Sequence, residues 1–285
     1  MVYSMLPPDI TVVAENATPY LYFSDRYTRL FCGDTFELLS RFKESSVDMI
    51  FADPPYFLSN GGVTCRAGKM VSVNVASWDE GKTPAQRHDF NRRWLAACYR
   101  LLKPTGTIWV SGTLHNIYSV GMALEQEGYK ILNNITWQKT NPPPNLRCRC
   151  FTHSTETLLW ARKKSGGLQY VFNYDLMREL NGGKQMKDVW TGALTSKSEK
   201  FAGTHPTQKP EYLLERIVLA STNPGAVVLD PFCGSGTTGV VARRHGRFFV
   251  GIDNVSDYLS IARKRLEREI WPETSTRGSE PSGQA

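Results

Sequence analysis

The chain has 285 residues, of which 41% are hydrophobic and 21% are charged, a composition typical of a globular protein with an ordinary core. Its formal net charge of +7 favours a polyanionic partner such as nucleic acid, although many basic proteins bind none. The six cysteines are scattered, the N-terminal segment lacks the apolar run of a signal peptide, and no stretch is long enough to span a bilayer. We therefore expect a reduced, cytoplasmic protein without a membrane segment.

Short apolar runs rich in β-branched or aromatic residues alternate with helix-like segments along most of the chain. The predicted strands cover residues 47–52, 107–111, 131–137, 157–161, 226–229 and 248–252. The predicted helices cover residues 35–42, 90–102, 117–127, 212–220 and 237–245. Because strands that alternate with helices form covered parallel sheets, we predict an α/β fold with a mostly parallel twisted sheet and helices on both faces.

Residues 103–106, with the sequence K-P-T-G, predict a helix stop and a turn that lead directly into the next strand. Two regions interrupt the alternation. Residues 57–87 are rich in Gly, Ser, Asn and Lys and predict a long loop, a feature that is usually functional or mobile. Residues 139–204 include a stiff N-P-P-P-N run and many basic and aromatic side chains, which indicates an inserted recognition region.

A strand that ends at Asp230 leads into a glycine-rich turn and then a helix. Gly234, Gly236 and Gly239 have the G-x-G-x-x-G spacing, which permits a tight turn and close backbone approach to a ligand. The next strand ends at Asp253, where a carboxylate can accept hydrogen bonds from ribose hydroxyls. The pattern predicts a nucleotide or nucleoside cofactor and leaves NAD and S-adenosylmethionine open, as well as a turn that serves only strand–helix packing.

The tetrapeptide Asp53-Pro54-Pro55-Tyr56 follows the predicted strand 47–52 and bears on this choice. Ligands of open α/β sheets bind beyond the carboxyl strand ends, so the tetrapeptide is expected in the same crevice as the glycine turn. The Asp53 carboxylate and the Pro54 carbonyl can accept the N–H bonds of an aromatic amine and direct its lone pair at a sulfonium methyl group. The alternative is a buried turn with a capping Asp and a packed Tyr.

Tyr56 suits a stacking surface for a base that has been flipped out of a duplex. An NAD-dependent oxidoreductase would use the same glycine turn, but it leaves the tetrapeptide unexplained and lacks an evident proton-transfer pair. Enzymes that methylate cytosine or glutamine more often carry Ser or Asn at the first tetrapeptide position, where this chain has Asp53. The residues therefore favour an adenine amine as the methyl acceptor.

The order of these motifs resembles the β-group of DNA amino-methyltransferases, over about residues 27–268. In that group a D-P-P-Y half precedes an F-x-G-x-G half, as residues 53–56 precede residues 232–236 here, and a target-recognition region lies between them. The resemblance implies the S-adenosylmethionine-dependent methyltransferase fold, with S-adenosylmethionine as cofactor and DNA as partner.

Several stretches, among them I-F-A-D-P-P-Y-F-L-S-N-G-G and H-P-T-Q-K-P-E-Y, also resemble the second methyltransferases of DpnII-type restriction systems. This subgroup implies methylation of adenine N6 in GATC, on duplex and single-stranded DNA, by a bacterial or phage enzyme that can form a homodimer. Pro143 and residues 147–150 depart from the subgroup near the recognition region. Another adenine-containing target such as GANTC therefore stays open as an alternative.

Together with the resemblance, the composition predicts a division of the chain into an N-terminal extension (1–26), a catalytic half (27–138), a target-recognition region (139–204), a cofactor half (205–270) and a tail (271–285) whose Pro, Ser, Thr, Gly and Glu content predicts disorder. The resemblance implies that the catalytic residues are Asp53, Pro54, Pro55 and Tyr56. The implied cofactor-binding residues are Asp34, Asp53, His205, Thr207, Lys209, Asp230, Phe232, Gly234, Ser235, Gly236, Thr237 and Asp253. His205 is expected in the cofactor shell rather than as a general base, and no metal is expected.

Basic residues of the recognition region are interleaved with aromatic ones, as phosphate contacts beside stacking surfaces require. The predicted DNA contacts are Arg147, Arg149, Lys163 and Lys164. Basic residues that follow a rigid proline run can be held toward a duplex, which supports the two arginines. The alternative is a solvated strand edge beside core aromatics, and Trp160 favours the core because it alternates within an apolar strand.

Overall fold

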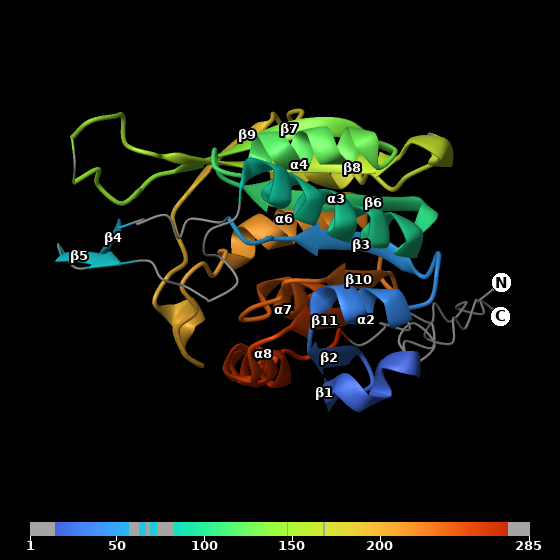
Figure 1. Ribbon diagram of the computed structural model, residues 1–285. Coiled ribbons are helices and arrows are strands. Elements are labelled where there is room, and N and C mark those ends of the chain that lie inside the picture. Colours follow the sequence, from blue (N-terminus) through green and yellow to red (C-terminus); the bar gives the residue numbers. More distant parts are fainter. Residues whose placement is uncertain are drawn as a thin grey trace, which may run out of the picture.

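The computed structural model describes residues 15–56, 63–66, 69–72, 83–146, 148–167 and 169–272 (Figure 1). The strands are β1 (Leu21–Ser24), β2 (Thr28–Cys32), β3 (Val47–Ala52), β4 (Val63–Arg66), β5 (Lys69–Ser72), β6 (Leu102–Gly112), β7 (Tyr129–Lys139), β8 (Thr155–Lys163), β9 (Val189–Gly192), β10 (Val227–Asp230) and β11 (Phe248–Asp253). The helices are α2 (Thr35–Arg41), α3 (Pro84–Leu101), α4 (Ile117–Gln126), α5 (Tyr174–Leu180), α6 (Glu211–Ser221), α7 (Thr237–Arg244) and α8 (Ser256–Arg268), with short 3-10 turns η1 (Glu15–Tyr20), η3 (Lys164–Gly166) and η4 (Ser198–Lys200). Among these described helices, none is long and apolar enough to cross a membrane.

Within the described ranges the chain forms a nine-stranded sheet in the order β1-β2-β11-β10-β3-β6-β8-β7-β9. Strands β2, β11, β10, β3 and β6 form one continuous parallel block. Strand β8 runs antiparallel to both of its neighbours, and β1 runs antiparallel to β2 at one edge. The predicted mostly parallel sheet is confirmed. Because the strands of the parallel block run in one direction, their carboxyl ends lie together at the same end of the sheet, its carboxyl edge.

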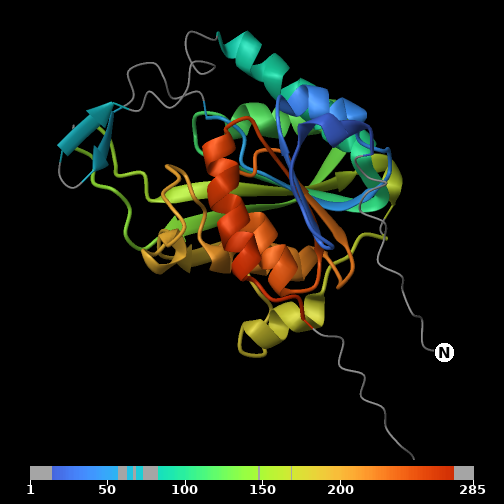
Figure 2. The same cartoon turned by 90° about the horizontal axis from the view of Figure 1, so that it is seen from below.

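Alternate residues of the central strands face two different layers of helices, because side chains along a strand point to opposite faces. Ile50 and Leu229 pack with residues of α2, α3 and α4. Met49 and Val228 pack instead with residues of α6, α7 and α8. Figure 2 shows the blue and teal helices on one side of the sheet and the orange and red helices on the other. The predicted helices on both faces are therefore confirmed.

The helix stop predicted at residues 103–106 is confirmed, because α3 ends at Leu101, but the predicted turn is wrong, because these residues belong to β6. Val47 pairs with Leu102 whereas Met49 pairs with Thr107, so the four residues form an irregularity within the ladder. Gly106 lies against the backbone of β3, where a Cβ atom would be 3.0 Å from the carbonyl oxygen of Val47. The K-P-T-G pattern thus marks a bulge within β6 rather than a turn that precedes the strand.

The predicted loop 57–87 is wrong at its C-terminal end, because α3 begins at Pro84. Thr83 caps this helix by accepting the N–H of Gln86, whose side chain accepts the N–H of Thr83 in return. This capping box with proline at the first helical position is a signal that the sequence carries. Within the same segment, β4 and β5 form an antiparallel hairpin, and residues 57–62, 67–68 and 73–82 lie outside the described residues.

Residues 139–204, predicted as an insert, contribute two strands to the main sheet. Strand β8 lies between β6 and β7, and β9 pairs in parallel with the edge strand β7. Figure 1 shows the loop between β7 and β8 and the β4–β5 hairpin projecting on the same side of the molecule, beyond the carboxyl ends of the central strands. The part that extends from the sheet is therefore this loop, and its role in target recognition stays a prediction.

The described residues of the predicted N-terminal extension and of the predicted tail contact the rest of the fold. Strand β1, within the predicted extension 1–26, pairs with β2. Trp271, within the predicted tail, stacks on Tyr27 with ring centroids 3.9 Å apart. The prediction of disorder is thus wrong for Trp271, whereas residues 1–14 and 273–285 lie outside the described residues.

Gly239 is the third glycine of the G-x-G-x-x-G pattern and lies where α7 contacts β11. A Cβ atom at this position would lie 2.4 Å from the ring of Phe249. Phe249 is fully buried, so its ring has no free space into which it can move. The glycine is therefore required for close packing of the helix on the strand.

We expect Gly239→Ala to lower the free energy of unfolding by about 1–3 kcal/mol because of this overlap. Gly121→Ala in α4 is the matched control, since the nearest atom to its new Cβ is Leu159 Cδ1 at 3.6 Å. The control is expected to gain up to about 1 kcal/mol from helix propensity. Urea unfolding of both variants measures the difference, and equal stabilities would contradict the packing argument.

Candidate active site

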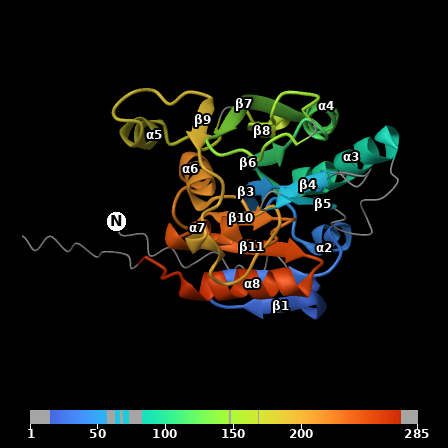
Figure 3. The same cartoon turned by 90° about the vertical axis from the view of Figure 1, so that its left-hand side faces the viewer.

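The carboxyl ends of β2, β11, β10 and β3 surround a cavity of about 450 Å³. Its walls include Asp34 after β2, Asp53 after β3, Asp230 at the end of β10 and Asp253 at the end of β11. Figure 3, in which the carboxyl edge of the sheet faces the viewer, shows β3, β10 and β11 side by side. The tetrapeptide and the glycine turn therefore share one crevice, as the sequence predicted.

The glycine turn adopts a conformation that disfavours other residues. Gly234 and Gly236 have φ angles of 49° and 72°, and Gly236 is the residue that precedes α7. A Cβ atom at Gly236 would lie 2.8 Å from the Cβ of Ala262. Asp253 holds the turn from the next strand, because its Oδ2 accepts the N–H of Gly234 at 2.9 Å. Each oxygen of a carboxylate has a second lone pair, so Asp253 can still accept a ribose hydroxyl.

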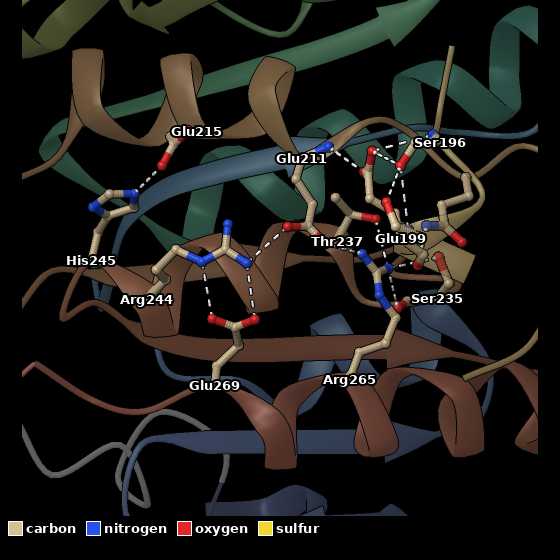
Figure 4. A network of polar contacts seen from close by, with 12 residues as sticks. Ser196, Glu199, Glu211, Glu215, Ser235, Thr237, Arg244, His245, Arg265 and Glu269 are labelled. Carbon is tan, nitrogen blue, oxygen red and sulfur yellow. Dashed lines mark hydrogen bonds and ion pairs between the residues drawn. The ribbon is translucent and has the colours of Figure 1, made fainter. Parts of the chain in front are cut away.

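Arg265 of α8 supports the glycine turn from behind, a role that no sequence motif indicated. Its side chain is 1% exposed and donates to the Ser235 carbonyl and the Thr237 hydroxyl, both at 2.9 Å. Ser235 and Thr237, both predicted to bind cofactor, line the cavity with their hydroxyls engaged by this guanidinium. Figure 4 shows the three side chains together. Arg265 thus holds the turn in its cavity-facing conformation.

Glu211 of α6 connects this support to the other helices on the same face. It accepts a hydrogen bond from Arg265 at 2.9 Å and one from Arg244 at 2.8 Å. Arg244 in turn pairs with both oxygens of Glu269 at 2.9 Å (Figure 4). The network joins α6, α7 and the end of α8, so the position of the cofactor turn depends on the packing of this helical layer.

Asp230 places a carboxyl group in the cavity wall with little solvent around it. The residue is 3% exposed, its Oδ2 accepts the Thr238 hydroxyl at 2.6 Å, and its Oδ1 accepts the N–H of Phe232 at 3.1 Å. Burial raises the pKa of Asp230 to about 7, and the nearby carboxylates of Asp53 and Asp253 also raise it. A cationic group in the cavity would favour the charged form, which suits the ammonium of S-adenosylmethionine.

Aromatic rings form a second wall of the cavity. Phe232 packs edge-on against Trp94 at 5.6 Å, and Phe36 packs edge-on against Phe90 at 5.3 Å. Of these, Phe36, Phe90 and Phe232 line the cavity, and only Phe232 was predicted. The N-cap of α2, Asp34, lies beside them with an exposed side chain. A flat apolar wall and nearby acids fit an adenosine group, so the residues present can hold S-adenosylmethionine.

His205 and Thr207 belong to the segment before α6 and line the cavity, as predicted for cofactor-shell residues. The His205 ring lies against Gly234, where a Cβ atom would be 2.9 Å from Nε2. It also contacts Tyr258 edge-on, with ring centroids 4.3 Å apart. Burial, together with the charges of Lys209 and Arg265, lowers the pKa of His205 to about 4. A neutral ring wedged against the glycine turn supports a structural role over general-base catalysis.

Asp53 and Tyr56 of the tetrapeptide form a compact cluster with Lys209. The Tyr56 hydroxyl donates to Asp53 Oδ1, and Lys209 Nζ donates to Asp53 Oδ2 at 2.5 Å. Lys209 Nζ also lies 3.0 Å from the Tyr56 hydroxyl. Lys209 was predicted to bind cofactor; it lines the cavity with its ammonium directed at the Asp53 carboxylate, and a contact with the cofactor stays a prediction. Pro54 and Pro55 line the cavity beside this cluster.

Two residues of the predicted recognition region complete this cluster. Glu156 on β8 lies 3.5 Å from Lys209 and 2.6 Å from Lys139 on β7. Burial lowers the pKa of Lys209, but the carboxylates of Asp53 and Glu156 and the Tyr56 hydroxyl raise it more, so its net shift is upward. Burial raises the pKa of Glu156, but Lys209 and Lys139 lower it more. Both groups are therefore charged at neutral pH, and neither Glu156 nor Lys139 was identified from the sequence.

The predicted DNA contacts divide between two ends of the sheet. Arg149 is exposed on the loop between β7 and β8, beside Phe151, which is 96% exposed, and Arg147 lies outside the described residues. Lys163 and Lys164 lie at the opposite end of the strands, where Lys163 is 9% exposed and lies 4.7 Å from the Tyr99 ring centre, and their contact with DNA stays a prediction. The structure does not bring these two lysines to the cavity.

Trp160 confirms its prediction as a core residue. It is 4% exposed and stacks on Trp109 of the adjacent strand, with ring centroids 5.0 Å apart. Because Trp160 is buried halfway along β8 and does not line the cavity, its side chain cannot contact DNA.

Comparison with known proteins places this geometry in a family. The DNA methylase family matches residues 47–264. The chain is 65% identical over 248 residues to the type II methyltransferase M2.DpnII of Streptococcus pneumoniae, covering 87% of this chain and 92% of that protein. It is 47% identical over 254 residues to the type II methyltransferase M2.MboI of Moraxella bovis, covering 89% of this chain and 92% of that protein.

Solved structures agree with this assignment. The crystal structure of the M1.HpyAVI–SAM complex is 28% identical with a TM-score of 0.60, covering 84% of this chain and 99% of that chain. The PvuII DNA methyltransferase, described as cytosine-N4-specific, shares the fold at 18% identity and a TM-score of 0.67, covering 87% and 89% of the two chains. The oxidoreductase alternative is thereby excluded. The chain belongs to the DNA methylase family and is a DNA methyltransferase that uses S-adenosylmethionine.

Proposed function

We propose that this enzyme methylates the N6 amine of adenine in GATC. The observation that carries the proposal is the Asp53 carboxylate, which lies in the cofactor cavity with the Pro54 and Tyr56 side chains beside it. The 65% identity to M2.DpnII supports the GATC target implied by the resemblance to the second methyltransferases of DpnII-type systems. The same resemblance supports acceptance of single-stranded as well as duplex DNA, and a homodimer as the assembly.

Adenine N6 is a poor nucleophile because its lone pair is delocalised into the ring. When bound, S-adenosylmethionine supplies an electrophilic sulfonium methyl group. The Asp53 carboxylate and the Pro54 carbonyl accept the two N–H bonds of the amine, which favours a pyramidal nitrogen with its lone pair directed at that methyl group. With the cofactor bound, the N–C bond would form as the S–C bond breaks and S-adenosylhomocysteine leaves, and the nitrogen would lose its proton to solvent during or after the transfer.

Access to the amine requires the base to leave the duplex, since a paired and stacked adenine cannot present N6 to Asp53. The Tyr56 ring lines the cavity and offers the stacking surface for the extruded base. Arg149 and Phe151 lie on the loop that projects from the carboxyl edge of the sheet, where cation and ring can contact the strand. These residues support a path for DNA across the carboxyl strand ends.

The target is tested with tritiated S-adenosylmethionine and two DNA duplexes that differ only in the presence of GATC. We expect label in N6-methyladenine, and only in the duplex with the site. Nuclease digestion followed by chromatography identifies the labelled nucleoside. Label in N4-methylcytosine would contradict the choice of base, and equal transfer to both duplexes would contradict the target.

Asp53→Ala is expected to lower kcat by at least about 100-fold, since it removes an acceptor aligned with the reacting amine. The affinity for S-adenosylmethionine should change far less, because the glycine turn, Asp230 and Asp253 are retained. Asp175→Ala is the control, as the Asp175 side chain is 95% exposed on α5. Steady-state kinetics and calorimetry measure the two effects, and near-normal turnover of Asp53→Ala would rule out its catalytic role.

The raised pKa of Asp230 predicts that cofactor affinity depends on pH. Below about pH 7 the free enzyme must release the Asp230 proton before the carboxylate can pair with an ammonium, so affinity should rise with pH by up to about tenfold per unit and level off above the pKa. Titration calorimetry in buffers of different ionisation enthalpy should show proton release at about pH 6. Asp230→Asn should bind more weakly, without this dependence; an unchanged dependence in this variant would assign it to another group.

A further inference from the structure

Lys209 Nζ lies between two carboxylates at unequal distances. It is 2.5 Å from Asp53 Oδ2 and 3.5 Å from Glu156 Oε2. Among the described residues, Glu156 Oε2 is buried and accepts no hydrogen bond, although Glu156 Oε1 is paired with Lys139 at 2.6 Å. A buried carboxylate oxygen without a donor is costly, so this oxygen is a free acceptor within short reach of the ammonium.

In the proposed methyl transfer, Asp53 must also accept a hydrogen bond from the target amine. Its Oδ1 already accepts the Tyr56 hydroxyl, and its Oδ2 accepts the Lys209 ammonium. A target amine must approach the same carboxylate with its own N–H donor, and a protonated lysine at 2.5 Å competes for that charge. Each Asp53 oxygen keeps a second lone pair, so the amine can still bind, but the ammonium weakens the hydrogen bond from the amine unless it moves to another partner.

We propose that Lys209 moves from Asp53 to Glu156 when the target amine enters, which makes Glu156 a positioning residue for the catalytic carboxylate. The inference rests on the proposed function, since it assumes an amine that donates to Asp53. Glu156 acts through Lys209 and touches neither substrate nor cofactor. Its role is to accept the displaced ammonium, so that Asp53 keeps its charge and gains the amine.

The surroundings of the cluster favour such an exchange. Asp53 and Glu156 carry two negative charges and Lys139 and Lys209 carry two positive ones, so the cluster stays neutral wherever the Lys209 ammonium lies. The Lys209 side chain is 7% exposed and the Glu156 side chain is 11% exposed, so solvent cannot easily replace either partner. Without Glu156, a displaced Lys209 would become a buried unpaired charge, which is strongly unfavourable.

The backbone fixes Glu156 in place for this role. Glu156 pairs with Trp137 in the β7–β8 ladder, and the Lys139 N–H donates to the Ser154 carbonyl at 2.8 Å. Lys139 therefore lies close to Glu156 on the neighbouring strand and holds its Oε1. The other oxygen is left directed toward Lys209. Glu156 is thus held by one lysine in an orientation that can receive the other.

The test compares single-turnover rates of wild type, Glu156→Gln and the double variant Glu156→Gln/Lys209→Met on GATC duplex with saturating S-adenosylmethionine. Glu156→Gln should be at least about tenfold slower, because the ammonium remains on Asp53. The double variant should be faster than Glu156→Gln, because no ammonium is left to compete with the amine. A residue that only stabilised the fold would not give this rescue.

Alongside the rates, calorimetry measures S-adenosylmethionine binding and urea unfolding measures stability. The cofactor affinity of Glu156→Gln should stay within about twofold of wild type. The matched control is Glu127→Gln, whose carboxylate pairs with Arg92 at 2.7 Å outside the cavity lining and should leave the rate unchanged. A double variant as slow as or slower than Glu156→Gln, or a Glu156→Gln rate equal to wild type, would overturn the proposal.

Glu156→Asp covers the case in which Glu156→Gln does not fold. It keeps the charge but withdraws the carboxylate by one methylene, so an intermediate rate is expected and a wild-type rate would overturn the exchange. The wild-type assay separates this inference from the proposed function. If wild type forms no N6-methyladenine, the proposed function fails. If wild type forms N6-methyladenine but the variants do not show the expected rates, only the role of Glu156 is refuted.

Discussion

The parallel pairing of β3 with β10 is the constraint on which the site depends. Met49 and Ile50 lie beside Val228 and Leu229 in parallel register, although the two strands are far apart in the sequence. Because parallel strands end at the same edge, Asp53 and Asp230 are delivered to one cavity. An antiparallel pair would have placed the acceptor for the amine and the acid for the cofactor at opposite edges of the sheet.

Charge is distributed to match two ligands of opposite sign. The chain carries a net charge of +7, which suits DNA, yet the cavity gathers the carboxylates of Asp34, Asp53, Asp230 and Asp253. S-adenosylmethionine carries a sulfonium and an ammonium, so an acidic cavity favours it over a phosphate-bearing cofactor. Burial that raises the pKa of Asp230 adds to this preference, because a cation in the cavity offsets the remaining cost of its charge.

Two buried cations, Arg265 and Lys209, maintain the geometry at the cavity. Arg265 holds the glycine turn through Ser235 and Thr237, and Lys209 holds Asp53 and Tyr56. Both cations are buried and paired with acids from other elements, namely Glu211 on α6 and Glu156 on β8. Such paired buried charges lose much if one partner is removed, which keeps the backbone of the turn and the catalytic carboxylate in fixed positions.

The sequence by itself determined the local features: the central strands, the glycine turn after Asp230 and the tetrapeptide after β3 are encoded in short patterns of apolar residues, Gly and Pro. Only the tertiary structure decided which side chains meet. Lys209 contacts Asp53 across 156 positions of sequence, and the reversed direction of β8 brings Glu156 to Lys209 while it carries Lys163 to the far end of the strands. Strand order and direction arise from packing of the whole chain, so a local pattern contains no record of them.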